Sequence, residues 1–476
     1  MNEGMIRKKY NAMSLQVKAA FWYTVCNILQ KGISLIAVPI YTRIMTAEQY
    51  GAYSVFLSWL EIFEIVATFR LSWGGYIVGL TKYEDDRDGY TSSMECLGFS
   101  ITSIVFVIYL LFSDWIDQFT GMNFALTLLM FALLYAMPVI SFWTARQRVE
   151  YRYIMAVIVT LTSSLLIPII GIWAALRMPN KEYAIIGARA VVQCTIALVL
   201  LISSLRKHFV FYQKEYWNRA LQFNVPLLPY YLSTVLLHSS DRIVIKSLVG
   251  QAQAGIYSVA YSAAMVMQLF NTAINASMQS WLFKRMKEER YHGIGRIINS
   301  SLMIVGGLNL LLIAFAPEAI AVLAPADYHE AIWVVPPLAA SVFVMFFYQH
   351  FVNIEFYYEE SKITALASIG AAVLNVFLNY RLIPVVGYLA AGYTTLFSYI
   401  LFAIVHYFFM GKVCKRNHCP KDILDIHGMV RVLVLFMIIA GILTIGYGIT
   451  VLRYSVIVAI LAIAVWKRND VIRLLK

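Results

Sequence analysis

Nine charged side chains interrupt the long apolar stretches of this sequence, and they are its main candidates for chemistry. A charged group at the centre of a membrane helix costs about 2.5–3.5 kcal/mol, so such groups pair, face a cavity or serve a function. An embedded cation can hold an anion such as a pyrophosphate by charge-assisted hydrogen bonds. An embedded carboxylate can carry a proton or a coupling ion. The nine are Lys31, Glu61, Glu64, Arg70, Arg189, Asp241, Arg242, Lys246 and Glu355.

Three of these charges are expected at a similar depth. Lys31 precedes Arg43 by twelve residues, which is about 18 Å of helix. Glu61 and Glu64 follow Gly51 by ten and thirteen residues, about 15 and 20 Å down the next helix, and their spacing puts both on one face. We therefore predict a cluster of Lys31 with Glu61 and Glu64. It would either lock two helices together or take part in substrate or proton binding.

A second group of charges, Asp241, Arg242 and Lys246, lies near one end of an apolar stretch. A cation there could hold an anionic headgroup, or the group could form an intrahelical or interfacial ion pair. Polar side chains in neighbouring stretches could form interhelical hydrogen bonds or recognise sugar hydroxyls. They are His238, Gln268, Asn271, Asn275, His350, Asn353, Asn375 and Asn379.

The elements that must position these residues follow from composition. Of the 476 residues 61% are hydrophobic and 13% are charged, whereas a globular protein carries about 25% charged residues. So few charges cannot cover a soluble fold of this size, but lipid can replace water around a polytopic membrane protein. This composition excludes a soluble enzyme, a secreted disulfide scaffold and a nucleic-acid-binding domain.

Stretches of about 20 apolar residues predict membrane-spanning helices, and the chain contains about fourteen. We expect an all-α polytopic membrane protein. The approximate spans are 20–42, 51–79, 96–113, 124–143, 154–176, 183–205, 223–247, 255–281, 297–316, 332–357, 363–380, 385–411, 432–447 and 449–466.

The Lys and Arg residues in the connecting segments predict the orientation. One set of alternate segments, which includes both termini, holds 28 of them, and the other set holds 5. Because cytoplasmic loops are enriched in Lys and Arg, we expect both termini in the cytoplasm. The net charge of +12 is therefore mainly a topology signal.

An internal repeat predicts two lobes. Gln49, Gly51 and Tyr53-Ser-Val55 recur 204 residues later as Gln253, Gly255 and Tyr257-Ser-Val259, at the same place in the predicted topology. An offset of six helices keeps the orientation, so the repeat is parallel, although a shared helix-start signal would give the same match. We expect an N-terminal six-helix lobe at 1–205, a cytoplasmic linker at 206–222, a C-terminal six-helix lobe at 223–411, and a loop with two peripheral helices at 412–476.

The linker mixes cations with aromatic residues between Arg206 and Arg219. This pattern is typical of an interfacial segment on anionic membrane lipid, which we expect as a partner. The chain has no Gly-x-x-x-x-Gly-Lys-Ser/Thr loop and no long soluble segment. We therefore expect no nucleotide, metal or other cofactor, and a membrane glycosyltransferase or polymerase is disfavoured.

Three motifs resemble a known family. The run from Pro39 to Gly51 resembles the first hairpin of the bacterial polysaccharide transporters, within the multidrug/oligosaccharidyl-lipid/polysaccharide exporter superfamily. The segment 145–152 is similar to the basic link after the fourth helix of that family, and Pro226, 241–245 and 255–257 resemble its seventh-helix signature. With the predicted topology, the resemblance covers essentially the whole chain.

The resemblance implies a flippase in the bacterial cytoplasmic membrane that moves undecaprenyl-pyrophosphate-linked oligosaccharide between leaflets by alternating access, for O-antigen, capsule or exopolysaccharide synthesis. It implies binding of the pyrophosphate or acidic sugars by embedded cations, here Lys31, Arg70, Arg189 and Arg242, and coupling or charge pairing through acids, here Glu61, Glu64 and Asp241. A polysaccharide polymerase and a chain-length regulator are further expected partners, and nucleic acid is not. The alternatives are a cation-coupled multidrug exporter and a peptidoglycan-precursor flippase.

Overall fold

The protein is built entirely of helices and connecting turns in the part of the chain that the computed structural model describes, residues 13–420 and 423–466. Fourteen described helices, the shortest of 17 residues, stand at the fourteen predicted places, so the predicted all-α fold is confirmed. Eleven of the described helices are long and apolar enough to cross a membrane. Polar side chains reduce the mean hydropathy of α11 and α12, and α19 is short, so these three fall outside that group.

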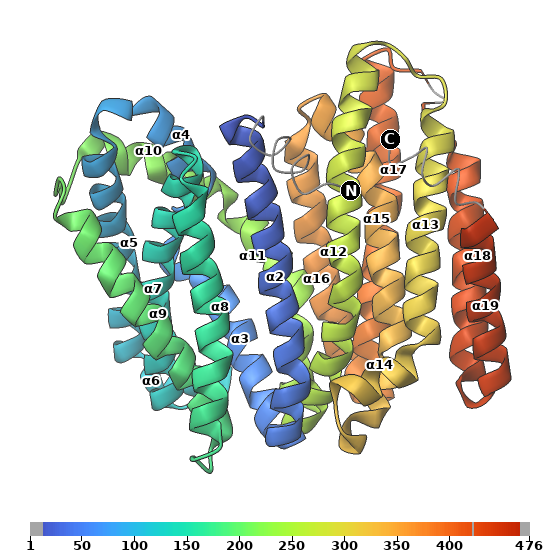
Figure 1. Cartoon of the computed structure of the whole chain (residues 1–476), viewed down its shortest axis with the longest axis horizontal. Helices are drawn as coiled ribbons and strands as arrows, with labels where there is room; N and C mark the ends of the chain where they lie inside the picture. The colour runs from blue at the N-terminus through green and yellow to red at the C-terminus, as the bar shows by residue number, and fades with distance from the viewer. Residues whose placement is uncertain (1–12, 421–422, 467–476) are drawn as a thin grey trace, which may run out of the picture. The chain divides into compact units, whose positions relative to one another are not determined.

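The chain divides into two compact units at Val235 and Leu236, within α11. This division assigns α10 and the first part of α11 to the N-terminal unit, whereas the sequence had suggested a lobe that ends at residue 205. The two units are coloured from blue to green and from green to red in Figure 1.

The described part of the N-terminal unit, from residue 13 on, contains nine α-helices before α11. They are α2 (Leu15–Ile44), α3 (Ala47–Thr68), α4 (Gly74–Lys82), α5 (Arg87–Leu111), α6 (Ser113–Thr120), α7 (Phe124–Val149), α8 (Tyr153–Ala175), α9 (Lys181–Leu205) and α10 (Lys214–Asn224). Side chains of Ser14, Thr46 and Asn123 cap the first backbone N–H groups of α2, α3 and α7, so each helix begins where the sequence supplies a capping residue.

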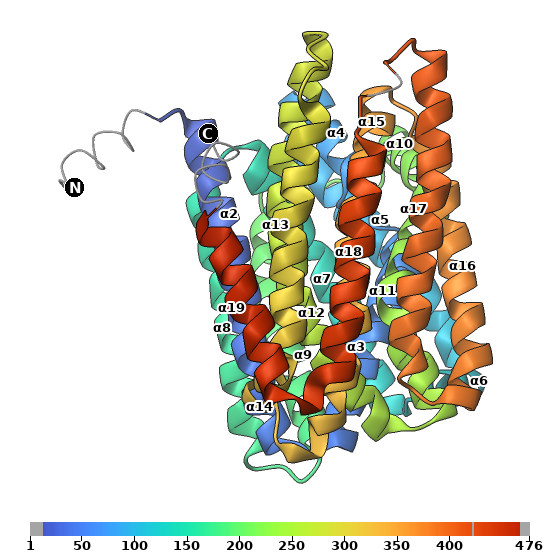
Figure 2. The same ribbon diagram turned by 90° about the vertical axis from the view of Figure 1, so that its right-hand side faces the viewer.

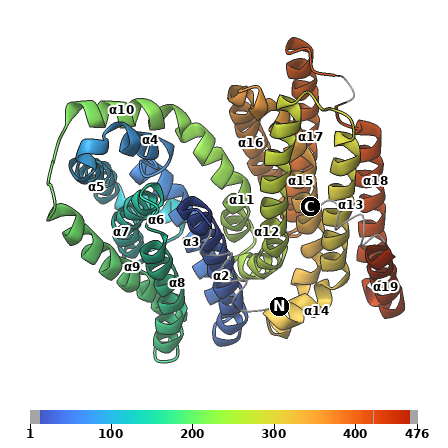
Figure 3. The same ribbon diagram turned by 45° about the horizontal axis from the view of Figure 1, so that its top comes forward.

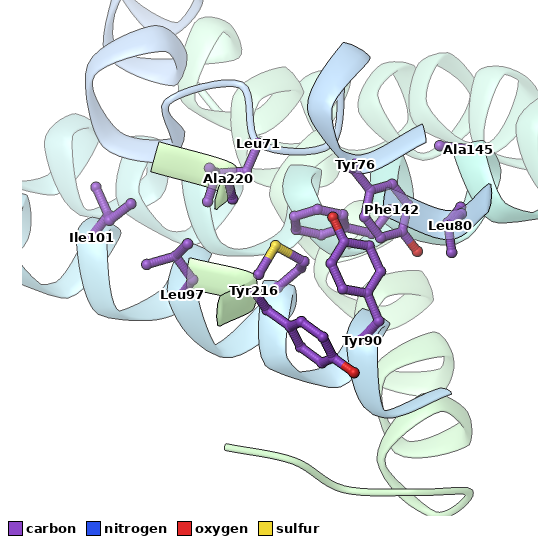
Figure 4. Packing of buried hydrophobic residues seen from close by; sticks show 11 residues of the cluster. Leu71, Tyr76, Leu80, Tyr90, Leu97, Ile101, Phe142, Ala145, Tyr216 and Ala220 are labelled. Atoms are coloured by element: carbon purple, nitrogen blue, oxygen red, sulfur yellow. The ribbon is translucent and has the colours of Figure 1, made fainter. Parts of the chain in front are cut away.

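An aromatic core closes one end of the N-terminal unit. Tyr76 of α4 stacks on Tyr90 of α5, and Phe142 of α7 meets the Tyr76 ring edge-on, with centroids 5.6 and 4.8 Å apart (Figure 4). Tyr216 and Ala220 of α10 are buried in the same cluster. The linker expected at 206–222 is thus partly helical, and α10 packs against α4 and α5 (Figure 3).

The C-terminal unit surrounds one buried helix. Most side chains around α15 are apolar, and its polar residues His350 and Glu355 are buried too, so that helix lies at the centre and packs against α12, α13 and α17. The described elements are the part of α11 (Leu228–Leu248) from Leu236 on, α12 (Gln251–Lys287), α13 (Ile294–Ala314), α14 (Ala316–Leu323), α15 (Val335–Tyr357), α16 (Ser361–Val386), α17 (Ala390–Arg416), α18 (Ile426–Ile445) and α19 (Thr450–Trp466).

The last two helices form a hairpin that turns at Gly446–Gly448 and packs on α13 (Figure 2). Arg453 of α19 anchors it, because its Nη1 donates to Glu318 Oε2 of α14 at 2.8 Å and to the Ala314 carbonyl at 3.1 Å. Arg453 is one of the five Lys and Arg residues counted above in the second set of connecting segments, and it is only 6% exposed.

The repeated residues have matching surroundings in the two units. Ser54 and Ser258 donate to the carbonyls of Tyr50 and Ala254 four residues earlier, and Val55 and Val259 are both buried. Helices α3 and α12 both follow a two-residue turn. The match therefore extends from the helix start into the packing of each unit.

Candidate functional site

A break after α3 presents Arg70. The sequence predicted a continuous helix over 51–79, but α3 ends at Thr68, and α4 begins at Gly74. Phe69 and Arg70 have φ values of 52° and 47°, which are unfavourable for residues other than glycine. Thr68 stabilises the break, since its hydroxyl accepts a hydrogen bond from the Arg70 backbone N–H at 3.1 Å. The predicted continuous span over 51–79 is therefore wrong. The sequence did not indicate the break, because residues 69–73 contain neither Pro nor Gly.

The side chain of Arg70 lies among one carboxylate and two aromatic rings. Its guanidinium carbon is 4.7 Å from the Trp73 ring centroid and 5.5 Å from that of Tyr231. Its Nη2 is 3.9 Å from Glu64 Oε2, a long ion pair. The buried Nε–H has no hydrogen-bond partner among the described residues. Arg70 therefore keeps donor capacity for an anion.

Of the other charges predicted in the N-terminal unit, Glu61 adjoins Glu64 on α3, whereas Lys31 and Arg189 lie on other helices. Lys31 is exposed on α2, and the ion-pair partner of Glu64 is Arg70, so the predicted pairing of Lys31 with Glu64 is not what the structure shows. Glu61 is exposed one turn before Glu64. Arg189 is half-buried on α9 beside Tyr41 of α2, and its buried Nε–H also lacks a hydrogen-bond partner within the described chain.

The C-terminal unit contains a buried polar network centred on Asp241 of α11, which is 1% exposed. Its Oδ2 accepts hydrogen bonds from the Tyr257 hydroxyl at 2.5 Å and from the Thr395 hydroxyl at 3.0 Å. Its Oδ1 accepts one from Asn379 Nδ2 at 2.7 Å. The carboxylate is thus surrounded by neutral donors from α12, α16 and α17.

Further side chains extend this network. Asn375 Nδ2 donates to the Thr395 hydroxyl at 3.1 Å, and its Oδ1 accepts from Asn379. The Thr394 hydroxyl donates to Asn379 Oδ1. The network offers one carboxylate, two amide oxygens and hydroxyls, which are the ligand types of hard cations. The network could therefore take up and release positive charge, either as a proton on Asp241 or as a monovalent cation around which the amides rotate. Among the described residues, no three His, Cys, Asp or Glu side chains form a metal-binding group.

A pocket adjoins the network, since Thr395 lines both, and its space together with the open solvent at its mouth is about 330 Å³. Its walls come from α11, α12, α15 and α17 and include His238, Tyr261, Gln268 and Tyr399. Arg242 stacks on Tyr261 with its guanidinium carbon 4.1 Å from the ring centroid. The pocket therefore brings an aromatic, mostly apolar surface beside a buried carboxylate.

Sequence reasoning missed part of both sites. The sequence did not single out Thr394 and Thr395, because a hydroxyl in an apolar helix usually forms a hydrogen bond with the backbone of its own helix. Glu355 was recognised as embedded, but its buried partner His406 was not, although the His406 Nδ1 lies 2.9 Å from the Glu355 carboxylate. For Asn375 and Asn379 the sequence left open interhelical hydrogen bonds or sugar recognition, and both side chains donate to other helices, to Thr395 and Asp241.

Comparison with known proteins identifies the fold. An inward-facing multidrug resistance transporter of the MATE family, within the MOP superfamily, superposes with a TM-score of 0.67 at 14% identity, over 81% of this chain and 95% of the other. The lipid II flippase MurJ in an inward closed conformation also gives 0.67, at 13% identity over 94% and 99%. A MOP superfamily transporter from Pyrococcus furiosus gives 0.56 at 11% identity over 87% and 98%. The fold is therefore that of the superfamily that the sequence motifs indicated, in a multi-pass membrane protein.

Sequence comparison gives the family. An uncharacterised membrane protein of Methanocaldococcus jannaschii is 21% identical over 437 residues, which cover 85% of this chain and 86% of that protein. The sequence model of the family described as polysaccharide biosynthesis protein matches residues 16–278, more than half of the 476 residues. The chain thus belongs to the polysaccharide biosynthesis protein family.

Proposed function

We propose that this protein is a flippase that moves undecaprenyl-pyrophosphate-linked oligosaccharide from the inner to the outer leaflet of the bacterial cytoplasmic membrane, for O-antigen, capsule or exopolysaccharide synthesis. The observation that carries the proposal is the family match over residues 16–278. The similarity of the fold to that of the lipid II flippase MurJ supports the proposal, because that protein is named for the movement of lipid II. In this proposal both termini are cytoplasmic, and the chain acts as a transporter, not as an enzyme.

Arg70 is the proposed centre of pyrophosphate recognition. The unpartnered Nε–H and the long contact to Glu64 leave the guanidinium free to bind phosphate oxygens in a planar, two-point arrangement. Trp73 and Tyr231 hold that plane from its faces and offer rings on which a sugar could stack. Arg189, Lys31 and Arg242 are the further cations proposed to contact the pyrophosphate or acidic sugars.

Asp241 is the proposed coupling residue, with Glu64 and Glu61 as secondary candidates. A buried carboxylate that meets only neutral donors and the neighbouring Arg242 can change its interactions when it binds a proton or a monovalent cation. The three donors come from three different helices, so this change would alter the packing of α11 against α12, α16 and α17. Such differential binding is what alternating access requires.

The test is deletion of the gene in a polysaccharide-producing strain, with complementation by variants. We expect lipid-linked repeat units to accumulate in the inner leaflet and surface polysaccharide to disappear. The Arg70→Ala variant should restore less than about a tenth of the wild-type polysaccharide, the factor for the loss of one hydrogen bond to a charged group. Arg70→Lys should restore an intermediate amount, because it keeps the charge but not the planar fork.

Arg177→Ala is the matched control, because Arg177 also stacks on an aromatic ring, that of Trp173, but lies exposed after α8. It should complement fully. Normal polysaccharide after deletion, in a strain without a second flippase, would refute the proposed function. Full complementation by Arg70→Ala would instead refute only the assignment of the site.

The pocket beside Asp241 favours a second candidate, a cation-coupled exporter of small amphipathic drugs. Its walls carry Tyr261 and Tyr399, and the fold resembles that of a multidrug resistance transporter. This function predicts changed drug susceptibility and unchanged polysaccharide after deletion. A peptidoglycan-precursor flippase would instead be required for viability.

A further inference from the structure

A second pocket opens in the N-terminal unit, where α5 begins and α7 and α9 end. Its space together with the open solvent at its mouth is about 360 Å³. Polar side chains from all three helices line it, together with Arg152 and Lys207 from the segments that follow α7 and α9. The pocket is separate from Arg70 and from the Asp241 network, and the proposed transport function does not use it.

A buried carboxylate lies in the wall of this pocket. Glu95 of α5 is 2% exposed, and its Oε2 has no hydrogen-bond partner among the described residues. Ser204 and Arg146 lie beside the carboxylate. A buried acceptor without a donor is unfavourable, so a ligand that brings an N–H group to Oε2 would be bound.

The cations of the pocket differ in how far they are already engaged. Arg146 is neutralised, because its Nη1 is 2.5 Å from Asp88 and its Nε 2.8 Å from Glu150. Arg152 and Lys207 have only longer contacts with these acids, at 3.3 and 4.0 Å, and their side chains are 64% and 49% exposed. Most of their N–H donors therefore remain available for an anion at the mouth.

The pocket thus offers a positive mouth and a negative interior. A ligand that fits both carries a phosphate and, a short distance away, a primary ammonium group. Trp143 also lines the pocket, where its apolar side chain can pack against the methylene groups between them. The pocket lies at one end of three membrane-spanning helices, and this is the depth at which lipid headgroups lie.

We propose that this pocket binds a phosphoethanolamine group, carried by a phospholipid of the surrounding bilayer. The ammonium donates to Glu95, and the phosphodiester accepts from Arg152 and Lys207. Phosphatidylglycerol lacks the ammonium, and phosphatidylcholine has a quaternary nitrogen without N–H donors. The geometry therefore selects phosphatidylethanolamine over both.

The test is lipid retention by the purified full-length protein, measured by native mass spectrometry after addition of each of the three phospholipids. Wild-type protein should retain phosphatidylethanolamine about tenfold more tightly than the others, the factor for a hydrogen bond to a charged group. Glu95→Gln should abolish that preference. The Arg152→Ala/Lys207→Ala double variant, at exposed positions that tolerate change, should weaken all three lipids.

Lys287→Ala, an exposed cation at the end of α12, is the control and should bind as wild type does. Equal retention of the three lipids by wild-type protein would overturn the proposal, as would an unchanged preference in both the Glu95 and the double variant. Soluble phosphoethanolamine is the last arm. If it binds while the lipid does not, the pocket serves a free metabolite, and the lipid proposal is wrong.

Discussion

Removing the Asp241 carboxylate should destabilise the C-terminal unit more than any exposed charge can. The Asp241→Ala substitution leaves the Tyr257 hydroxyl, Asn379 Nδ2 and the Thr395 hydroxyl without their acceptor, in a place that water does not reach. Each buried polar group left unsatisfied costs about 1–3 kcal/mol. Because Asn379 can still bond Asn375, we expect a total loss of about 3–6 kcal/mol.

The Asp241→Asn substitution separates charge from shape. It preserves one acceptor oxygen, and the Tyr257 and Thr395 hydroxyls can rotate to accept from the new amide. We therefore expect a smaller loss, about 1–3 kcal/mol. Transport should fail in this variant even where the protein folds, since the amide cannot take up a proton and lacks the negative charge that would hold a coupling cation.

The assay is the free energy of unfolding of the purified protein in detergent, together with transport in cells. Asp85→Ala is the control, because Asp85 is exposed in the turn before α5 and should change stability by less than about 0.5 kcal/mol. The reasoning would be refuted if the free energy of unfolding of Asp241→Ala lay within about 1 kcal/mol of the wild-type value, the lower bound for one unsatisfied group. It would also be refuted if Asp241→Asn transported normally.

Two further substitutions test the packing that holds each unit. A Cβ added at Gly79 would clash with the hydroxyl oxygen of the stacked Tyr90, so Gly79→Ala should lower the free energy of unfolding by about 1–3 kcal/mol. A Cβ added at Gly411 of α17 meets nothing within 4 Å, so Gly411→Ala should be neutral or stabilising by about 1 kcal/mol. Thermal unfolding of the two variants side by side checks this, and equal stabilities would contradict it. Burial alone would raise the pKa of Glu318, but the hydrogen bonds from Arg453 and Tyr454 leave the pKa below its ordinary value. Its contribution to stability is therefore present above the unfolded pKa of about 4.3 and is lost as the pH falls through the folded pKa. Wild type should be more stable than Glu318→Gln at pH 7, and the gap should narrow below pH about 4; a gap that is constant with pH would show that the charge of Glu318 does not matter.

Much of the fold could be predicted because lipid imposes one length and one composition on every spanning helix. The exceptions have physical reasons. The break at Phe69 and Arg70 depends on two residues in the left-handed region, which the sequence does not mark. Arg453 was counted among the cations of the connecting segments, but it is buried, and Glu318 compensates its charge.

The candidate sites could be predicted only in part. Arg70 and Asp241 could be identified as candidates because a charge within an apolar helix costs free energy unless it is paired or has a function. Their partners could not be inferred, because Asn379 and Thr395 lie 138 and 154 residues from Asp241, and no periodicity connects them. For Lys31, equal depth on neighbouring helices suggested a pair, but depth does not determine which face a side chain occupies.

The most direct test of the central proposal is lipid movement in reconstituted proteoliposomes. Undecaprenyl-pyrophosphate-linked oligosaccharide is placed in both leaflets, and the fraction accessible to an external sugar-modifying enzyme is followed with time. With wild-type protein the accessible fraction should rise from about one half toward completeness, and Arg70→Ala should slow this rise about tenfold relative to Arg177→Ala. An accessible fraction that stays at one half with folded wild-type protein would contradict the proposal.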